Sequence, residues 1–182
     1  MKEIDRIVSG CLNGDSKCQL ELYNNYSPRF YALCLRYLGD TALAKDALVE
    51  GFISIYRNIE NFRNEGSFET WMNRIFINQC LNQIRDNQRR KTISIKEEDP
   101  PTTVSDIILH IDVQKALDES LAQLSDEERL VFNMIAVDEY TFADAAEMLN
   151  TNESAIKTRY YKAKDKMKHQ MSLRLGHNYT EN

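Results

Sequence analysis

One segment of the chain has residue types and spacing that suit contact with phosphate groups. Between residues 153 and 170, six lysines and arginines stand against two acids. Lysine and arginine neutralise the phosphates that dominate affinity for nucleic acids, so a helix carrying them predicts DNA contact. A solvated amphipathic helix could carry the same charges, and this alternative stays open. The bases are Lys157, Arg159, Lys162, Lys164, Lys166 and Lys168.

The order of side chains along this segment predicts two kinds of DNA contact. The N-terminal end of a recognition helix reaches base edges in the major groove. Here the early polar residues away from the apolar face are Glu153, Ser154, Lys157, Thr158 and Tyr161. The later bases are expected to meet phosphates, which position a helix but carry no sequence information. They are Lys162, Lys164, Lys166 and Lys168.

A second candidate surface combines aromatic and basic side chains. Phe68, Trp71 and Phe76 recur at helical spacing and lead into a polar and basic stretch. Unpaired bases stack on aromatic rings while Lys and Arg follow the backbone, so the pattern suits single-stranded DNA. An aromatic stripe is more often part of a core, and the pattern alone leaves both interpretations open. The polar and basic residues are Asn78, Asn82, Gln83, Arg85, Arg89 and Arg90.

The residue types that catalysis or metal binding would need are not grouped in the sequence. Cys11, Cys18, Cys34 and Cys80 lie inside helical patterns, without a Cys-x-x-Cys pair or a nearby histidine. Free cysteines of this kind pack as small apolar residues. Because no carboxylate pair or activated nucleophile can be placed either, we expect neither an enzyme nor a metal or cofactor site.

The apolar residues recur at intervals of three and four, and the chain has only three prolines and six glycines. This predicts an all-helical protein. Four helices are expected in a first domain, residues 1–91, with a stop at Gly39-Asp40 and Ser67 as N-cap of the fourth. Residues 92–109 lose the periodicity and contain Pro100 and Pro101, which predicts a flexible linker between two small domains.

The second predicted domain, residues 110–175, has the outline of a helix-turn-helix. Ser125 and Glu128 have the spacing of a capping box, Thr141 can cap a short helix, and Asn152 can cap the long basic one. Two helices joined by a short turn, the second long and basic, are typical of that motif. Residues 176–182 form a polar tail.

The overall charge and the start of the chain limit where the protein can act. A net charge of −5 argues against a protein that coats DNA unaided. The acidic start lacks the pattern of a secretory signal, and no uncharged apolar run approaches the roughly 20 residues of a membrane span. We therefore expect a cytoplasmic protein with no membrane insertion.

Two sets of motifs resemble the extracytoplasmic-function (ECF) subfamily of bacterial RNA polymerase sigma factors. The set resembling their second region is Gly39-Asp40, Ala44-x-Asp46-x-x-x-Glu50-x-Phe52 and Phe68-x-x-Trp71-Met72-x-x-Ile75-x-x-Asn78, leading to Arg85. The set resembling their fourth region is Leu124-Ser125, Arg129-x-Val131-Phe132, Ala145-Ala146-x-x-Leu149 and Ile156-Lys157-x-Arg159-x-x-x-Ala163. Their joint occurrence, in this order and spacing, is specific to the family.

The resemblance implies an alternative sigma factor, which binds core RNA polymerase and directs transcription from specific promoters. Asp46, Glu50 and Phe52 match the helix that binds the clamp helices of the β′ subunit, and the family's second domain also binds the β flap. An anti-sigma factor usually accompanies the family. Melting and reading of the minus-ten element are implied for Phe68, Trp71, Asn78, Arg85 and Arg89. Reading of the minus-thirty-five element is implied for Ser154, Lys157, Thr158, Arg159, Tyr161 and Lys162.

Four positions depart from the family pattern. Val49 replaces a usual glutamine, and Gly51 lies inside a helix, where glycine costs about 1 kcal/mol relative to alanine. Ser125 replaces a proline, and Asn150 replaces the glycine of the turn. Two other functions stay open: a helix-turn-helix transcriptional regulator that acts without core polymerase, and a sigma-like adaptor that binds partners but not DNA.

Overall fold

The structure, a computed structural model, describes residues 3–62, 66–93 and 111–175. In these ranges every regular element is helical, which confirms the expected all-helical fold. The chain divides into two compact units, Met1–Ile95 and Lys96–Asn182, which are described separately below. Residues 94–109 of the expected linker and the expected tail at 176–182 lie outside the described residues.

The described residues of the first unit form four α-helices whose ends follow local sequence signals. Gly39 adopts a left-handed conformation, with φ of 67°, and ends one helix, while the Asp40 carboxylate accepts the first amides of the next. Ser67 Oγ accepts the Thr70 amide at 3.0 Å, so Ser67 caps the fourth helix as expected. The helices are α1 (Glu3–Leu12), α2 (Ser16–Leu38), α3 (Thr41–Asn58) and α4 (Phe68–Ile93), with a short 3₁₀ turn, η1 (Ile59–Asn61).

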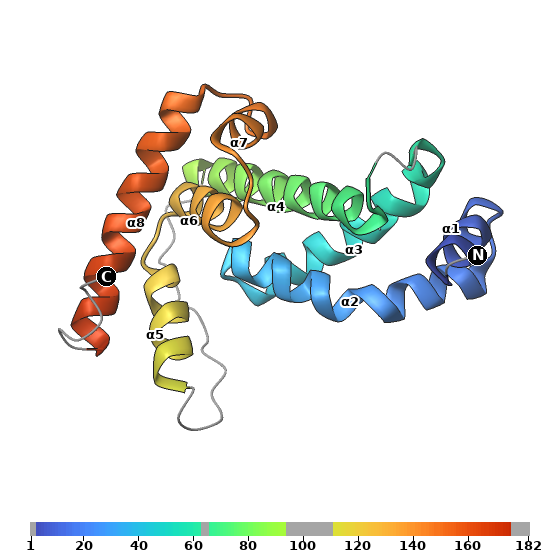
Figure 1. The fold of residues 1–182 in the computed structure, drawn as a ribbon, viewed down its shortest axis with the longest axis horizontal. Helices are drawn as coiled ribbons and strands as arrows, with labels where there is room; N and C mark the ends of the chain where they lie inside the picture. The colour runs from blue at the N-terminus through green and yellow to red at the C-terminus, as the bar shows by residue number, and fades with distance from the viewer. Residues whose placement is uncertain (1–2, 63–65, 94–110, 176–182) are drawn as a thin grey trace. The chain divides into compact units, whose positions relative to one another are not determined.

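The core of this unit lies where α2, α3 and α4 pack against one another (Figure 1). The Phe30 and Phe76 rings stack with centroids 4.1 Å apart, and Phe52 meets Phe76 edge to face at 5.4 Å. Burying such large aromatic rings contributes much of the stability of a small domain. The core therefore fixes the outer faces of α3 and α4 relative to each other.

Within residues 111–175, the second unit forms four α-helices, three of which begin with side-chain caps that the sequence predicts. Ser125 and Glu128 form a reciprocal capping box, Thr141 and Asp144 form another, and Asn152 Oδ1 accepts the Ala155 amide at 2.8 Å. The helices are α5 (Ile111–Ala122), α6 (Asp126–Phe132), α7 (Phe142–Met148) and α8 (Glu153–Leu175), with a π-helical turn, η2 (Asn133–Val137), after α6.

The long helix α8 is the element on which the second unit is built. Helices α5, α6 and α7 each pack against it (Figure 1). Its apolar residues Ala163 and Met167 join Leu121 and Leu124 in a buried cluster. The turn between α7 and α8 places Asn150 at φ 50°, a conformation that asparagine tolerates better than most residues. The helix-turn-helix outline is thus present, with asparagine in place of the turn glycine.

Candidate nucleic-acid interface

The outer face of α3 carries two of the three residues expected to bind a protein partner. Asp46, Val49 and Glu50 are exposed there. Phe52 is not: it is only 3% exposed, and its ring packs 4.8 Å from that of Tyr23. The structure therefore leaves Asp46 and Glu50 available for contact and places Phe52 in the core that holds α3.

The aromatic residues of α4 divide between the core and a partly exposed cluster. Phe76 is fully buried, and Phe68 is 6% exposed. Trp71 is half-buried and stacks on Phe68 at 5.4 Å, while Phe62 lies 5.7 Å from Trp71 and 5.0 Å from Phe68. Sequence reasoning missed Phe62. The available signal was an aromatic residue directly before the glycine-bearing segment that precedes α4.

A stripe of polar side chains follows Trp71 along one face of α4. Asn78, Arg85 and Arg89, with Asn82 between them, are exposed. Their separations from Trp71 fall close to whole turns of 3.6 residues, so all five side chains lie on the same face of the helix. A ring followed by amides and guanidinium groups can stack on an unpaired base and then follow its backbone.

The first three turns of α8 expose the polar side chains that the sequence predicts for base reading. Ser154, Lys157, Thr158 and Tyr161 are all exposed, and Tyr161 is 54% exposed. Lys157 forms an ion pair with Glu153 at 2.8 Å and lies over the Phe142 ring of α7. In the part of the chain that the structure describes, this end of α8 is capped, supported by α7 and open to a ligand.

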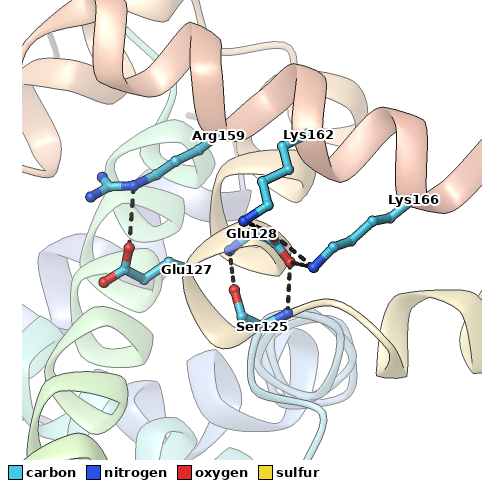
Figure 2. A network of polar contacts seen from close by, with 6 residues as sticks. All are labelled: Ser125, Glu127, Glu128, Arg159, Lys162 and Lys166. Carbon is cyan, nitrogen blue, oxygen red and sulfur yellow. Dashed lines mark hydrogen bonds and ion pairs between the residues drawn. The ribbon is translucent and has the colours of Figure 1, made fainter.

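Three bases of α8 instead face the acidic first turn of α6 (Figure 2). Arg159 Nε lies 3.2 Å from a Glu127 carboxylate oxygen. Lys166 Nζ donates to both Glu128 oxygens, at 2.9 and 2.7 Å, and Lys162 Nζ lies 3.4 Å from one of them. The sequence predicts Glu128 as a capping residue but gives no sign of these ion pairs, which depend on how α6 and α8 pack.

The Glu128 carboxylate is held in its charged form by this arrangement. Burial raises its pKa, because the side chain is only 6% exposed. Hydrogen bonds from Lys166, the Ser125 amide and Lys162 outweigh burial and lower the pKa to about 2. Glu128 therefore stays ionised at all physiological pH values.

The remaining chemical groups of the described residues offer no further site. The four cysteines are buried and free, and burial raises the pKa of Cys11 to about 11, which suppresses the reactive thiolate. In the described ranges no group of His, Cys, Asp and Glu could hold a metal ion. None of the described helices is long and apolar enough to cross a membrane.

Comparison with known families matches each unit to a separate family. Residues 22–90 match the family described as Sigma-70 region 2, and residues 114–167 match the one described as Sigma-70, region 4. Each match lies inside one compact unit, and together they include the candidate interface residues of α3 and α4 and all those of α8 except Lys168.

Curated relatives extend the similarity over most of the chain. ECF RNA polymerase sigma factor SigW of Bacillus subtilis is 25% identical over 180 residues, covering 92% of this chain and 96% of the relative. ECF RNA polymerase sigma factor SigM of Mycobacterium tuberculosis is 25% identical over 161 residues, covering 88% and 81%. The ECF sigma-E factor of Haemophilus influenzae is 28% identical over 175 residues, covering 87% and 90%.

Two solved structures share the fold. The sigma factor RpoE of Bartonella quintana, crystallised with the anti-sigma factor NepR, superposes with a TM-score of 0.63 at 17% identity, covering 84% of this chain and 96% of that one. CnrH in complex with the cytosolic domain of CnrY gives 0.54 at 15% identity, covering 92% and 96%.

Proposed function

The chain belongs to the sigma-70 family, as an alternative sigma factor of the extracytoplasmic-function type that directs transcription from specific promoters, and we propose that three exposed helical faces divide its work. The outer face of α3 binds core polymerase, the stripe of α4 opens and reads the minus-ten element, and the start of α8 reads the minus-thirty-five element. The observation that carries the proposal is the stripe from Trp71 to Arg89 on a single face of α4.

For polymerase binding, the contact residues are Asp46 and Glu50 on the exposed face of α3. Phe52 acts indirectly, since its buried ring fixes that helix on α4 through Phe76. Val49 contributes apolar area between the two acids, because it is 52% exposed on the same helix. The contact thus combines two charges with one apolar side chain.

For promoter opening, Trp71 supplies the exposed edge of an aromatic cluster that Phe68 and Phe62 support from behind. An unpaired base stacks on this cluster, and Asn78, Arg85 and Arg89 follow the strand away from it. Stacking offsets the few kcal/mol that unstacking a base costs. Members of this family are not enzymes in general, and we propose that phosphoryl transfer is left wholly to the polymerase.

For the distant element, Ser154, Lys157, Thr158 and Tyr161 read base edges, with Lys162 at the edge of that surface. The partners of the protein are core polymerase, through the β′ clamp helices and the β flap, promoter DNA and an anti-sigma factor. RpoE of Bartonella quintana was crystallised with the anti-sigma factor NepR, which supports the last of these partners. Because polymerase and promoter are its targets, we place the protein in the bacterial cytoplasm.

The experiment that tests this division uses one variant for each face and three assays. Reversing the charges of Asp46 and Glu50 to lysine should weaken retention of the full chain on core polymerase, whereas reversing Glu3, exposed on α1, should not. Replacing Trp71 with alanine should spare retention and impair strand opening. Replacing Lys157 should spare both and alter minus-thirty-five preference. Variants that fail all three assays equally would overturn the division.

The match to both sigma-70 regions favours a sigma factor over the two alternatives. A helix-turn-helix regulator needs only the second unit and would bind its site without polymerase. An adaptor would bind polymerase or a regulator but leave promoters closed. Footprinting with and without core polymerase distinguishes all three.

A further inference from the structure

Helix α8 carries two stripes of bases on opposite sides of its buried face. Arg159, Lys162 and Lys166 lie on the side that meets α6, where each approaches a carboxylate of Glu127 or Glu128. Lys164 and Lys168 lie on the other side, exposed, and make no ion pair with any residue that the structure describes. Position on the helix therefore separates bases that are already engaged from bases that are open to a phosphate.

We propose that Lys166 is a positioning residue, which fixes the recognition helix α8 against the start of α6 through Glu128 and does not contact DNA phosphate. The inference rests on the proposed role of α8 in reading the minus-thirty-five element. It replaces the expectation from the sequence that Lys166 contacts a phosphate of the DNA backbone.

Glu128 connects two helices through one carboxylate. Its oxygens accept the Ser125 amide at 3.1 Å, which closes the capping box of α6, and the Lys166 ammonium at 2.7 and 2.9 Å (Figure 2). Because the Glu128 carboxylate is held by the Ser125 amide at the start of α6, it has little freedom to move with the lysine. The pair therefore fixes the position of Lys166, and with it the middle of α8.

The burial of Glu128 keeps Lys166 in place when DNA is offered. The carboxylate is 6% exposed, and losing Lys166 would remove both of its short lysine hydrogen bonds from a buried charge, which is unfavourable. Moving Lys166 to a DNA phosphate would only exchange one ion pair for another, and the buried carboxylate would be left with one partner fewer. Lys162 is the more exchangeable partner of Glu128, because its side chain is 67% exposed and its contact, at 3.4 Å, is longer than those of Lys166. Lys162 can therefore turn to DNA while Lys166 stays.

The Lys166–Glu128 ion pair, called the α6–α8 clamp below, lies well away from the N-terminal residues of α8 that read bases, so a small rotation at the pair moves those residues. Lys166 follows Lys157 by nine residues, about 13 Å along a helix with a rise of 1.5 Å per residue. A small tilt of α8 at the clamp displaces Ser154, Lys157 and Thr158 relative to base edges. Loss of the clamp should therefore blur sequence preference without removing a phosphate contact.

The test compares Lys166→Met and Lys166→Arg with Lys168→Met in the reconstituted holoenzyme. Two quantities are measured: the preference for the best minus-thirty-five sequence over single mismatches, and the log–log slope of promoter affinity against salt. Lys166→Met should reduce the preference about fivefold, within the range of a lost base contact, and leave the slope unchanged. Lys168→Met should keep the preference and flatten the slope by about 0.9.

Two further variants, Lys166→Arg and Glu128→Gln, test whether the ion pair itself is responsible. Lys166→Arg should restore the preference, because a guanidinium can also bond both carboxylate oxygens. Glu128→Gln removes the other charge of the same ion pair but retains an acceptor for the Ser125 amide. It should reproduce the loss of sequence preference, and the double variant with Lys166→Met should lose no more than either single variant. If Lys166→Met does not fold, Glu128→Gln carries the test.

Titration of the Glu128 carboxyl by NMR in the full chain without DNA provides an independent measurement. Its midpoint should rise in Lys166→Met and not in Lys168→Met. A flattened salt slope with intact preference in Lys166→Met, or an unmoved Glu128 midpoint, would overturn the inference and leave the proposed function standing. A wild-type holoenzyme with no minus-thirty-five preference would instead overturn the proposed function, with the positioning role falling alongside it.

Discussion

Gly51 and Phe76 meet so closely in the core of the first unit that no side chain fits between them. A β-carbon built on Gly51 would lie 2.1 Å from Cε1 of the Phe76 ring and 2.5 Å from Cδ1. Phe76 cannot easily give way, because it stacks on Phe30 and meets Phe52 edge to face. The glycine that weakens helix α3 is thus what allows α4 to pack against it.

We predict that Gly51→Ala destabilises the first unit although alanine favours a helix. Alanine should gain about 1 kcal/mol in helix propensity, and overpacking a well-filled core typically costs about 1–3 kcal/mol. The net loss should appear as a lower midpoint in urea unfolding followed by Trp71 fluorescence. Lys45→Ala, at an exposed position of the same helix, is the control and should change stability little. An alanine variant more stable than wild type would show that Phe76 moves aside.

We predict that Trp71→Ala leaves the fold intact and impairs promoter opening. Trp71 is only half-buried, so its truncation should lower the free energy of unfolding by less than the loss of about 3–5 kcal/mol that is expected for a buried aromatic residue. Thermal melting and a fluorescent base analogue in the minus-ten element measure the two effects. Phe68→Ala, in the buried neighbour, should instead lower the melting temperature strongly. Normal opening by the Trp71 variant would remove it from the interface.

We predict that replacing Lys157 and Thr158 changes which minus-thirty-five sequences are used. Both side chains are exposed in the first two turns of α8, beyond its Asn152 cap. Each lost base contact should cost about 1–3 kcal/mol of discrimination at one position. Promoter use by the holoenzyme over a randomised element measures this, with Lys168→Ala as the control that weakens all sequences alike. Variants that keep the parental preference would exclude base reading by these two residues.

Several features of the fold follow from local signals and could be predicted from the sequence. The caps at Ser67, Ser125, Thr141 and Asn152 each depend only on side chains and amides three residues apart in the chain. The exposed face of α4 follows from helical spacing alone. Such features need no knowledge of what packs against the helix.

The features that could not be predicted all depend on contacts between helices. Phe52 and Phe68 belong to family motifs, yet both are buried, because neighbouring rings cover them. Gly51 is unfavourable for a helix by propensity, and only the position of the Phe76 ring explains why a glycine stands there. Likewise, the charge of Lys166 is visible in the sequence, but its partner on α6 is not.

We predict that Glu128 contributes stability to the second unit that disappears in acid. Its pKa of about 2 in the folded chain is below the ordinary 4.5, so the contribution is complete above about pH 4.5 and is lost as the pH falls toward 2. The difference in unfolding free energy between wild type and Glu128→Gln should shrink across that window. Amide signals of α8, followed in urea at several pH values, measure it. A difference that grows on acidification would contradict the lowered pKa.

As a sigma factor, this chain gives core RNA polymerase its promoter specificity. The most direct test is transcription of a promoter library by core polymerase from the source bacterium, with and without the purified chain. Transcripts are expected only when the chain is present, from promoters that share a minus-ten and a minus-thirty-five element. The Lys157 variant should show an altered preference for the minus-thirty-five element. A chain that binds core polymerase yet yields no transcripts above core alone, or transcripts from promoters without shared elements, would contradict it.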